Sequence, residues 1–248
     1  MTQLILSLFP GIGLLDMAFE QQGFCVVRGP DLLWGGDIRT FHPPAGRFDG
    51  VIGGPPCQCF STMAHVVKAR GYRLAENLIP EFERVLGEAR PTWFLMENVS
   101  AAPAPNAPGY YTTRTILDAR WVGSEQSRKR AFAFGHVARA VDLWRTLEIA
   151  PLEAATWQPA VMASGTRMKT TGSRTLHEVQ GPSWRTVEDA IRVQGLPEDF
   201  LNRFKEHAPL TAKGAQRMIG NGVDFRVGTA VAKAIRQALE SMAEGEAA

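Results

Sequence analysis

The stretch QLILSLFPGIGLLDMAFEQQGF, residues 3–24, joins a short apolar run to a helical pattern through a turn with two glycines. The residues that share one face of the predicted helix are Leu14, Leu15, Ala18 and Phe19. Gly23 ends that helix. Gly11 and Gly13 let the backbone approach a ligand closely, and the N-terminus of the following helix attracts negative charge. The stretch therefore predicts a strand, a ligand-binding turn and a helix; a plain tight turn is the alternative.

Further segments of both kinds follow along the chain. Apolar runs predict strands at residues 24–31, 48–56, 92–99 and 128–136. Helical spacing predicts helices at residues 78–91 and 227–245, and a further helix that begins at residue 186 and is stopped by Gly195 and Pro197. Strands that alternate with helices are typical of an α/β fold, so we expect a doubly wound, mostly parallel sheet with helices on both faces.

Residues 138–184 interrupt this alternation. They are rich in threonine, serine, glycine and proline, and they show no clear periodicity. We therefore expect two domains. The main one is formed by residues 1–137 and 211–248, and a small, irregular one covers residues 138–210.

The composition is typical of a soluble globular protein. Of the 248 residues, 45% are apolar and 21% are charged, and the net charge is only +2. The apolar runs are too short to cross a bilayer, and the first residues do not resemble a signal peptide. The three cysteines form no CxxC pair and have no zinc-ligand spacing, so we expect neither a disulfide nor a metal. We expect a cytoplasmic protein without membrane contact.

Two acidic residues follow the second predicted strand. Asp31 ends that strand, and Asp37 lies in the sequence GGDI. Ligands of open α/β sheets bind beyond the carboxyl ends of the strands, where carboxylates can accept hydrogen bonds from ribose hydroxyls or an adenine amino group. Turn formation is the alternative role for both residues. Asp16 occupies the position of the third glycine of a dinucleotide fingerprint, which disfavours a nicotinamide cofactor.

The stretch GGPPCQCFS, residues 53–61, predicts a nucleophile. Two prolines stiffen the backbone before Cys57, at the end of a predicted strand. The commoner fate of a cysteine is to be a small buried residue, which is the alternative. Glu97 ends the next apolar strand, where an unpaired carboxylate would be costly, so it needs a partner or a chemical role. Arg128 and Arg130 share one face of a third extended segment.

The segments FPGIG, GGPPCQ, ENV, QSRKR and IGNGV, in this order, resemble the motifs of cytosine-C5 DNA methyltransferases, including small bacterial or phage members. The resemblance covers nearly the whole chain except residues 138–184. It implies a Rossmann-like domain that binds S-adenosylmethionine and a target-recognition domain over residues 138–210. It also implies double-stranded DNA as the partner of a monomeric, cytoplasmic enzyme, in the context of restriction–modification.

The resemblance assigns roles to individual residues. The implied cofactor-binding residues are Phe9, Gly11, Gly13, Asp31, Asp37, Ile38, Pro56, Leu78, Asn221 and Val223. The implied catalytic residues are Cys57, Glu97, Arg128 and Arg130. Cys59 has no counterpart with a role in the family. Only five residues separate Asp31 from Asp37, which is short for the family.

The implied reaction begins with addition of the Cys57 thiolate to C6 of cytosine, which makes C5 nucleophilic. Glu97 is expected to act as proton donor at N3, and Arg130 to bind O2. Arg128 is expected to steady Glu97 or the loop after Cys57. The target base must leave the duplex, so that loop is expected to close over it.

Other parts of the chain are expected to contact DNA. The candidates for phosphate or groove contact are Ser61, Lys68, Arg70 and Arg73. The candidates for base reading are Arg167, Lys169, Arg174 and His177, flanked by Gly165, Gly172 and Gly181. A small insert presents few side chains, so we expect a recognition site of about two to four base pairs.

Two other functions fit the same residues. The first is methylation of cytosine in tRNA by a related enzyme. That branch carries an additional Cys-Phe-Thr signature, and residues 100–125 contain no cysteine. The second is a non-catalytic DNA-binding relative, against which the presence of every motif residue argues.

Overall fold

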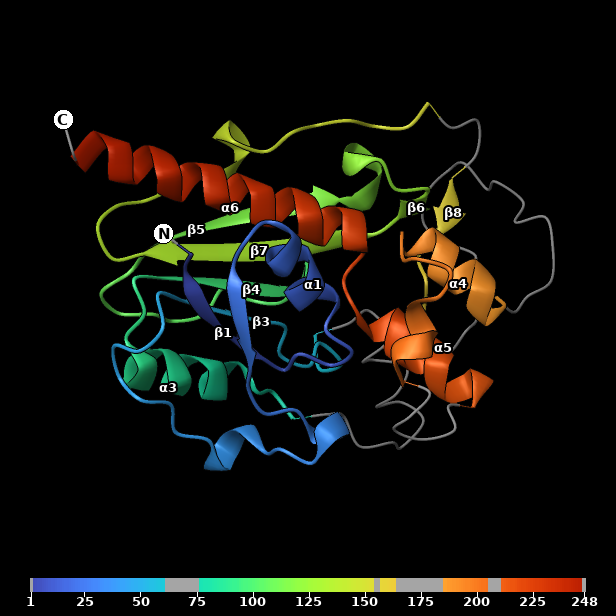
Figure 1. Ribbon diagram of the computed structural model, residues 1–248, viewed down its shortest axis with the longest axis horizontal. Coiled ribbons are helices and arrows are strands. Elements are labelled where there is room, and N and C mark those ends of the chain that lie inside the picture. The colour runs from blue at the N-terminus through green and yellow to red at the C-terminus, as the bar shows by residue number, and fades with distance from the viewer. Residues whose placement is uncertain (1, 61–75, 154–156, 164–184, 205–210, 247–248) are drawn as a thin grey trace.

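The computed structural model describes residues 2–60, 76–153, 157–163, 185–204 and 211–246. The strands are β1 (Leu4–Leu8), β2 (Cys25–Arg28), β3 (Gly50–Gly53), β4 (Trp93–Val99), β5 (Tyr111–Asp118), β6 (Gln126–Ser127), β7 (Lys129–His136) and β8 (Gln158–Pro159). The α-helices are α1 (Leu14–Gln21), α3 (Ile79–Ala89), α4 (Val187–Val193), α5 (Ala212–Asn221) and α6 (Phe225–Glu246). Short 3₁₀ turns include Leu32–Trp34, Ile38–Thr40 and Ala119–Val122. Figure 1 shows the sheet between α3 on one side and α1 with α6 on the other.

The main sheet has six strands in the order β2-β1-β3-β4-β7-β5. The pairs that join β2, β1, β3 and β4 are all parallel. β7 runs antiparallel to both of its neighbours, so it alone opposes the other five strands. The predicted α/β fold with a mostly parallel, Rossmann-like sheet is confirmed. The prediction missed β5, which reaches β7 through the short connection of residues 119–128 and therefore pairs with it antiparallel.

Strand alternation places two apolar cores on opposite faces of this sheet. Residues Ile5, Ile52, Trp93 and Phe132 belong to one core, together with apolar residues of α1 and α6. Their chain neighbours Leu6, Val51, Phe94 and Ala133 belong to the other core, together with apolar residues of α3. Successive strand residues point to opposite faces, so these nearly continuous apolar runs are typical of a sheet covered on both sides.

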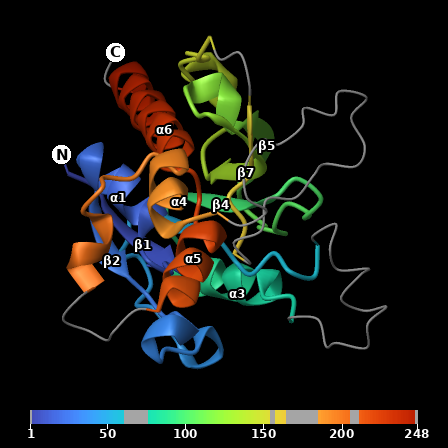
Figure 2. The same ribbon diagram turned by 90° about the vertical axis from the view of Figure 1, so that its right-hand side faces the viewer.

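The remaining elements lie at one end of the sheet. Figures 1 and 2 show α4 and α5 side by side there, with α5 leading into the long helix α6. β6 and β8 form a separate two-stranded parallel pair, in which Gln126 lies opposite Gln158. In the parts of the chain that the structure describes, no helix is long and apolar enough to cross a membrane.

Candidate active site

A cavity of about 680 Å³ lies beyond the carboxyl ends of β1, β3 and β4. This is the edge at which open α/β sheets bind ligands. The predicted site residues that line it are Phe9, Gly11, Asp31, Asp37, Ile38, Pro56, Cys57, Leu78, Glu97, Arg130, Asn221 and Val223. Gly13 and Arg128 were also predicted but do not line it. The structure therefore gathers residues that lie more than 200 positions apart in the sequence around one space.

The turn between β1 and α1 forms one wall. Gly11 and Gly13 both have positive φ angles, and so does Phe9, at 54°, a conformation that side-chain-bearing residues rarely adopt. The Phe9 amide is held by the carbonyl of Pro30 at 3.3 Å. Gly13 lies close to a neighbour, because a β-carbon there would come within 2.8 Å of the Arg28 guanidinium. Gly13 therefore shapes the turn from behind the cavity.

Asp31 joins this turn to the segment after β2. One carboxylate oxygen accepts a hydrogen bond from the Gly11 amide at 2.8 Å, and the other accepts one from the Leu33 amide at 2.8 Å. Asp31 thereby caps the 3₁₀ turn that follows it, as the turn-forming alternative predicted. It also lines the cavity. Asp31 can both form this turn and bind a ligand, since each carboxylate oxygen can accept more than one hydrogen bond.

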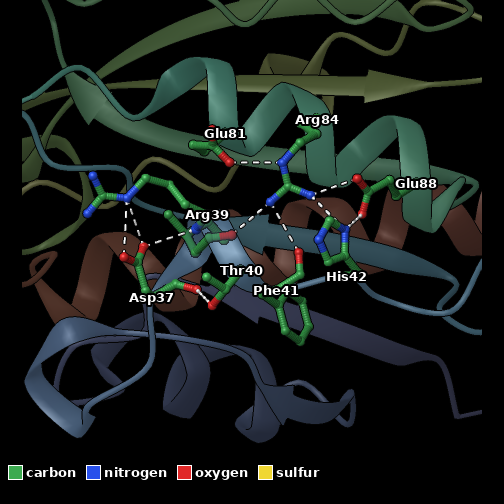
Figure 3. Close-up of polar contacts among 9 residues, drawn as sticks. Asp37, Arg39, Thr40, Phe41, His42, Glu81, Arg84 and Glu88 are labelled. Atoms are coloured by element: carbon green, nitrogen blue, oxygen red, sulfur yellow. Dashed lines mark hydrogen bonds and ion pairs between the residues drawn. The ribbon is translucent and has the colours of Figure 1, made fainter.

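Asp37 begins the next 3₁₀ turn and pairs with Arg39 (Figure 3). Its carboxylate accepts hydrogen bonds from the backbone amide and Nε of Arg39, both at 3.0 Å. These hydrogen bonds lower the pKa of Asp37, so the carboxylate is ionised at neutral pH. Ile38, the next residue, is buried beside the cavity.

Cys57, Glu97 and Arg130 meet at the opposite wall. Cys57 follows β3 after Gly54 and two prolines, and Asn98 donates a hydrogen bond to the Pro55 carbonyl at 3.1 Å. Nε of Arg130 lies 3.0 Å from Oε1 of Glu97, and the two side chains are only 19% and 16% exposed. The register of β4 on β7 places Arg130 diagonally across from Glu97, which brings the long side chains into contact.

The electrostatic environment of this wall favours the neutral forms of Cys57 and Glu97. Burial is the main cause that raises the pKa of Cys57, the negative charge of Glu97 raises it further, and Arg130 and Arg128 lower it. Burial also raises the pKa of Glu97, against the lowering effect of Arg130 and Arg128. A carboxyl group with a raised pKa can donate a proton, and its protonation would remove a charge that opposes the Cys57 thiolate.

Arg128 has different contacts from those expected. Its guanidinium donates hydrogen bonds to the backbone carbonyls of Val161, Gly220 and Gly222 at 2.8, 3.1 and 2.9 Å. Burial, together with the charge of Arg130, lowers the pKa of Arg128 to about 9, so it stays charged at neutral pH. Arg128 acts on Glu97 through its charge, while its hydrogen bonds tie the strand region to the turn that carries Asn221.

A buried polar network lies beside Arg128. Gln126 donates hydrogen bonds to Asp224 at 2.7 Å and to Gln194 at 2.6 Å, and its own oxygen accepts one from the Val161 amide at 3.0 Å. Ser124 also donates to Asp224, at 2.6 Å. The network connects β6, the end of α4 and the start of α6, and so fixes the wall formed by the Asn221 turn.

Other residues of the cavity were not predicted from the sequence. Asp16 is fully buried, and it binds Ser7 and, at 2.9 Å, Nε of Arg28. Burial raises its pKa. A charged residue in place of a fingerprint glycine was the signal that could have drawn attention to it. Gly214, Arg217 and Met218 come from α5, a helix that the sequence analysis did not identify although Thr211 caps it.

Several predicted contacts lie outside the described residues. For the loop after Cys57 these are Ser61, Lys68, Arg70 and Arg73. For the insert they are Arg167, Lys169, Arg174 and His177 with Gly165, Gly172 and Gly181. Within the described ranges, no group of three or more histidine, cysteine or acidic residues could hold a metal ion.

Comparison with known proteins places this site in context. Residues 35–142, which include Asp37, Cys57, Glu97 and Arg130, match the family described as C-5 cytosine-specific DNA methylase. The chain is 32% identical over 165 residues to the Type II methyltransferase M.NgoPII of Neisseria gonorrhoeae, covering 53% of this chain and 47% of that protein. It is 34% identical over 159 residues to M.HindV of Haemophilus influenzae, covering 52% and 51%. The chain thus spans about half the length of the curated relatives it matches.

Solved structures share the fold. The Dnmt2 methyltransferase of S. pombe superposes with a TM-score of 0.65 at 16% identity, covering 98% of this chain and 99% of that one. A DNA modification methyltransferase described as putative, encoded within a prophage of E. coli, superposes with a TM-score of 0.61 at 18% identity, covering 96% and 100%. At these identities the likeness concerns the fold alone.

Proposed function

We propose that this chain, whose residues 35–142 match the C-5 cytosine-specific DNA methylase family, is a DNA (cytosine-5-)-methyltransferase. One observation carries the proposal. Cys57, Glu97 and Arg130 converge on one wall of a cavity whose other walls hold a glycine turn and two carboxylates. Such a cavity has room for a nucleoside-bearing cofactor on one side and a cytosine ring on the other.

The residues present fit S-adenosylmethionine. A volume of about 680 Å³ is within the range for ligands of this size. The turn at Gly11 leaves space, because a β-carbon there would meet no atom within 4 Å. Asp31 and Asp37 supply acceptors for the ribose hydroxyls and the adenine amino group, and Ile38 and Leu78 supply apolar contacts. When bound, the cofactor supplies an electrophilic methyl group on a sulfonium.

We assign the base side of the cavity to Cys57, Glu97 and Arg130. The Cys57 thiolate adds to C6 of the cytosine, and Glu97 gives a proton to N3, which neutralises the charge that develops on the ring. Arg130 holds Glu97 at 3.0 Å and can donate a hydrogen bond to O2. After C5 has gained the methyl group, the C5 proton passes to solvent. Elimination of the Cys57 thiolate, with return of the N3 proton to Glu97, then restores the aromatic ring and the enzyme.

The proposed substrate is double-stranded DNA, from which the target base must be extruded. The domain over residues 138–210 is the proposed recognition element, and the relatives named Type II methyltransferases favour a restriction–modification context.

A methyl-transfer assay tests the proposal. The purified protein is incubated with tritiated S-adenosylmethionine and with either mixed-sequence duplex DNA or bulk tRNA. We expect label in duplex DNA with the wild type and none with Cys57→Ala. Label in tRNA alone would show that tRNA, and not DNA, is the substrate. Label in neither nucleic acid would favour a DNA-binding protein without catalytic activity.

A further inference from the structure

The turn that carries Asp37 and Ile38 has little structure of its own. The 3₁₀ helix spans only Ile38–Thr40, and it is closed by backbone hydrogen bonds of 3.2 Å from Thr40 to Asp37 and from Phe41 to Ile38. A single 3₁₀ turn is too short to hold its conformation without outside contacts. Arg39 holds the Asp37 carboxylate within the turn, so the position of that carboxylate in the cavity depends on what binds the turn as a whole.

Arg84 of α3 provides that contact (Figure 3). Its Nη2 donates hydrogen bonds to the backbone carbonyls of Ile38 and Phe41, at 2.7 and 3.1 Å. One nitrogen of the planar guanidinium thus bridges the start and the end of the turn. Hydrogen bonds from a charged donor are about twice as strong as those between neutral groups.

Two carboxylates on the same helix aim the guanidinium. Glu81 accepts from Nε of Arg84 at 2.9 Å, and Glu88 accepts from Nη1 at 2.7 Å. Glu88 also lies 3.0 Å from Nδ1 of His42, just past the turn. The Arg84 side chain is only 27% exposed, so the cluster is partly shielded from water. Its rigid fork is preorganised for binding the turn in a way that a lysine ammonium is not.

The same helix supports a second wall of the cavity. Leu78 directly precedes α3 and lines the cavity. It belongs with Ile38 and Phe82 to one buried apolar core. α3 therefore holds the Asp37 turn by polar contacts through Arg84 and by apolar contacts through Ile38.

We infer that Arg84 is a positioning residue for the adenine end of the cofactor pocket, where it fixes the turn that presents Asp37 and Ile38. This inference rests on the proposed function, because Asp37 is taken to bind the adenine amino group. Arg84 does not line the cavity, and it acts through the backbone of the turn.

The test compares two ligands that differ at the adenine amino group. S-adenosylhomocysteine carries this group, and S-inosylhomocysteine has an oxygen in its place. Their dissociation constants are measured by calorimetry for the wild type, for Arg84→Lys and for the matched control Arg236→Lys, which makes the same substitution in an ion pair with Glu240 of α6, away from the cavity lining. Thermal unfolding by circular dichroism shows that each variant is folded.

We expect the wild type and Arg236→Lys to prefer the adenosyl ligand by about tenfold or more, the effect of one hydrogen bond to a charged group. Arg84→Lys should bind the adenosyl ligand about tenfold more weakly and the inosyl ligand almost as well as the wild type, so that the preference falls below about threefold. The turnover number at saturating cofactor should change much less than the Michaelis constant for the cofactor.

If Arg84→Lys is unfolded at the assay temperature, the double variant Glu81→Gln/Glu88→Gln takes its place. It keeps Arg84 but removes the carboxylates that aim it, and the preference should again fall. An unchanged preference in a folded variant would overturn the inference and leave the proposed function intact. Failure of the wild type to bind either ligand would overturn both.

Discussion

Replacement of Glu97 by glutamine should slow methyl transfer but speed up chemical alkylation of the Cys57 thiol. The variant keeps the shape of the side chain but loses both its negative charge and its ability to give up a proton. Glu97 lies 3.0 Å from Arg130, and both side chains are largely buried, so solvent screens this part of the site poorly.

Methyl transfer should fall steeply in Glu97→Gln. An amide cannot protonate N3, and a positioned general acid contributes about 10²- to 10⁴-fold to a rate. The loss corresponds to about 3–5 kcal/mol of transition-state stabilisation. Binding of S-adenosylhomocysteine should change little, because the proposed cofactor ligands are Asp31 and Asp37 and not Glu97.

Alkylation of the resting thiol should become faster in the same variant. The charge of Glu97 raises the pKa of Cys57, so its removal lowers that pKa and increases the thiolate fraction at a given pH. For each unit by which a thiol pKa falls, the thiolate fraction rises about tenfold and the nucleophilicity of the thiolate falls about threefold. The net gain in rate is therefore about threefold per unit.

Iodoacetamide labelling, followed by mass spectrometry of the peptides, measures this rate residue by residue. Cys25 is exposed on β2, and so it serves as an internal standard in the same molecule. Arg130→Met should change the rate in the other direction, because Arg130 lowers the pKa of Cys57. Slower alkylation of Cys57 in Glu97→Gln, or turnover close to that of the wild type, would refute the reasoning.

Three further changes test other parts of the site. Cys57→Ala should abolish methyl transfer while Cys59→Ser keeps most of it, as measured by a tritium assay on duplex DNA. A large loss of activity in Cys59→Ser would contradict the assignment of Cys57 as the nucleophile. Asp37→Ala should weaken binding of S-adenosylhomocysteine by about tenfold, with a smaller effect on turnover at saturating cofactor. An unchanged dissociation constant in calorimetry would argue against Asp37 as a cofactor ligand. Gln126→Leu should lower the free energy of unfolding by about 2–4 kcal/mol in urea titrations, because the Asp224 carboxylate loses a buried donor; a loss below about 0.5 kcal/mol would show that water replaces it.

The layers of the fold were readable from the sequence because each strand supplies apolar residues to both faces. Trp93 and Phe94 are neighbours in the chain, yet they lie in different cores. The direction of β7 was not readable, since the same apolar run fits a parallel or an antiparallel neighbour. Strand β5 was missed because its first half is exposed and polar, and its place is set by pairing with β7.

The location of the candidate site was predictable for a related reason. Asp31 and Cys57 follow parallel strands, and Glu97 lies near the carboxyl end of another; the carboxyl ends of such strands meet at one edge. Contacts between side chains far apart in the sequence were not predictable. Examples are the hydrogen bonds from Arg84 to the Asp37 turn and from Arg128 to the Gly220 carbonyl. They depend on how the helices pack, which no local sequence pattern encodes.

Trapping of a covalent complex tests the central claim most directly. Duplex DNA of mixed sequence, with 5-fluorocytosine in place of cytosine, is incubated with the protein and S-adenosylmethionine, and the denaturation-resistant complex is digested and analysed by mass spectrometry. Fluorine cannot leave C5 as a proton does, so elimination of the enzyme is blocked. The account predicts a single adduct, which joins the sulfur of Cys57 to C6 of a C5-methylated base. No adduct, or one that maps to Cys59, would contradict it.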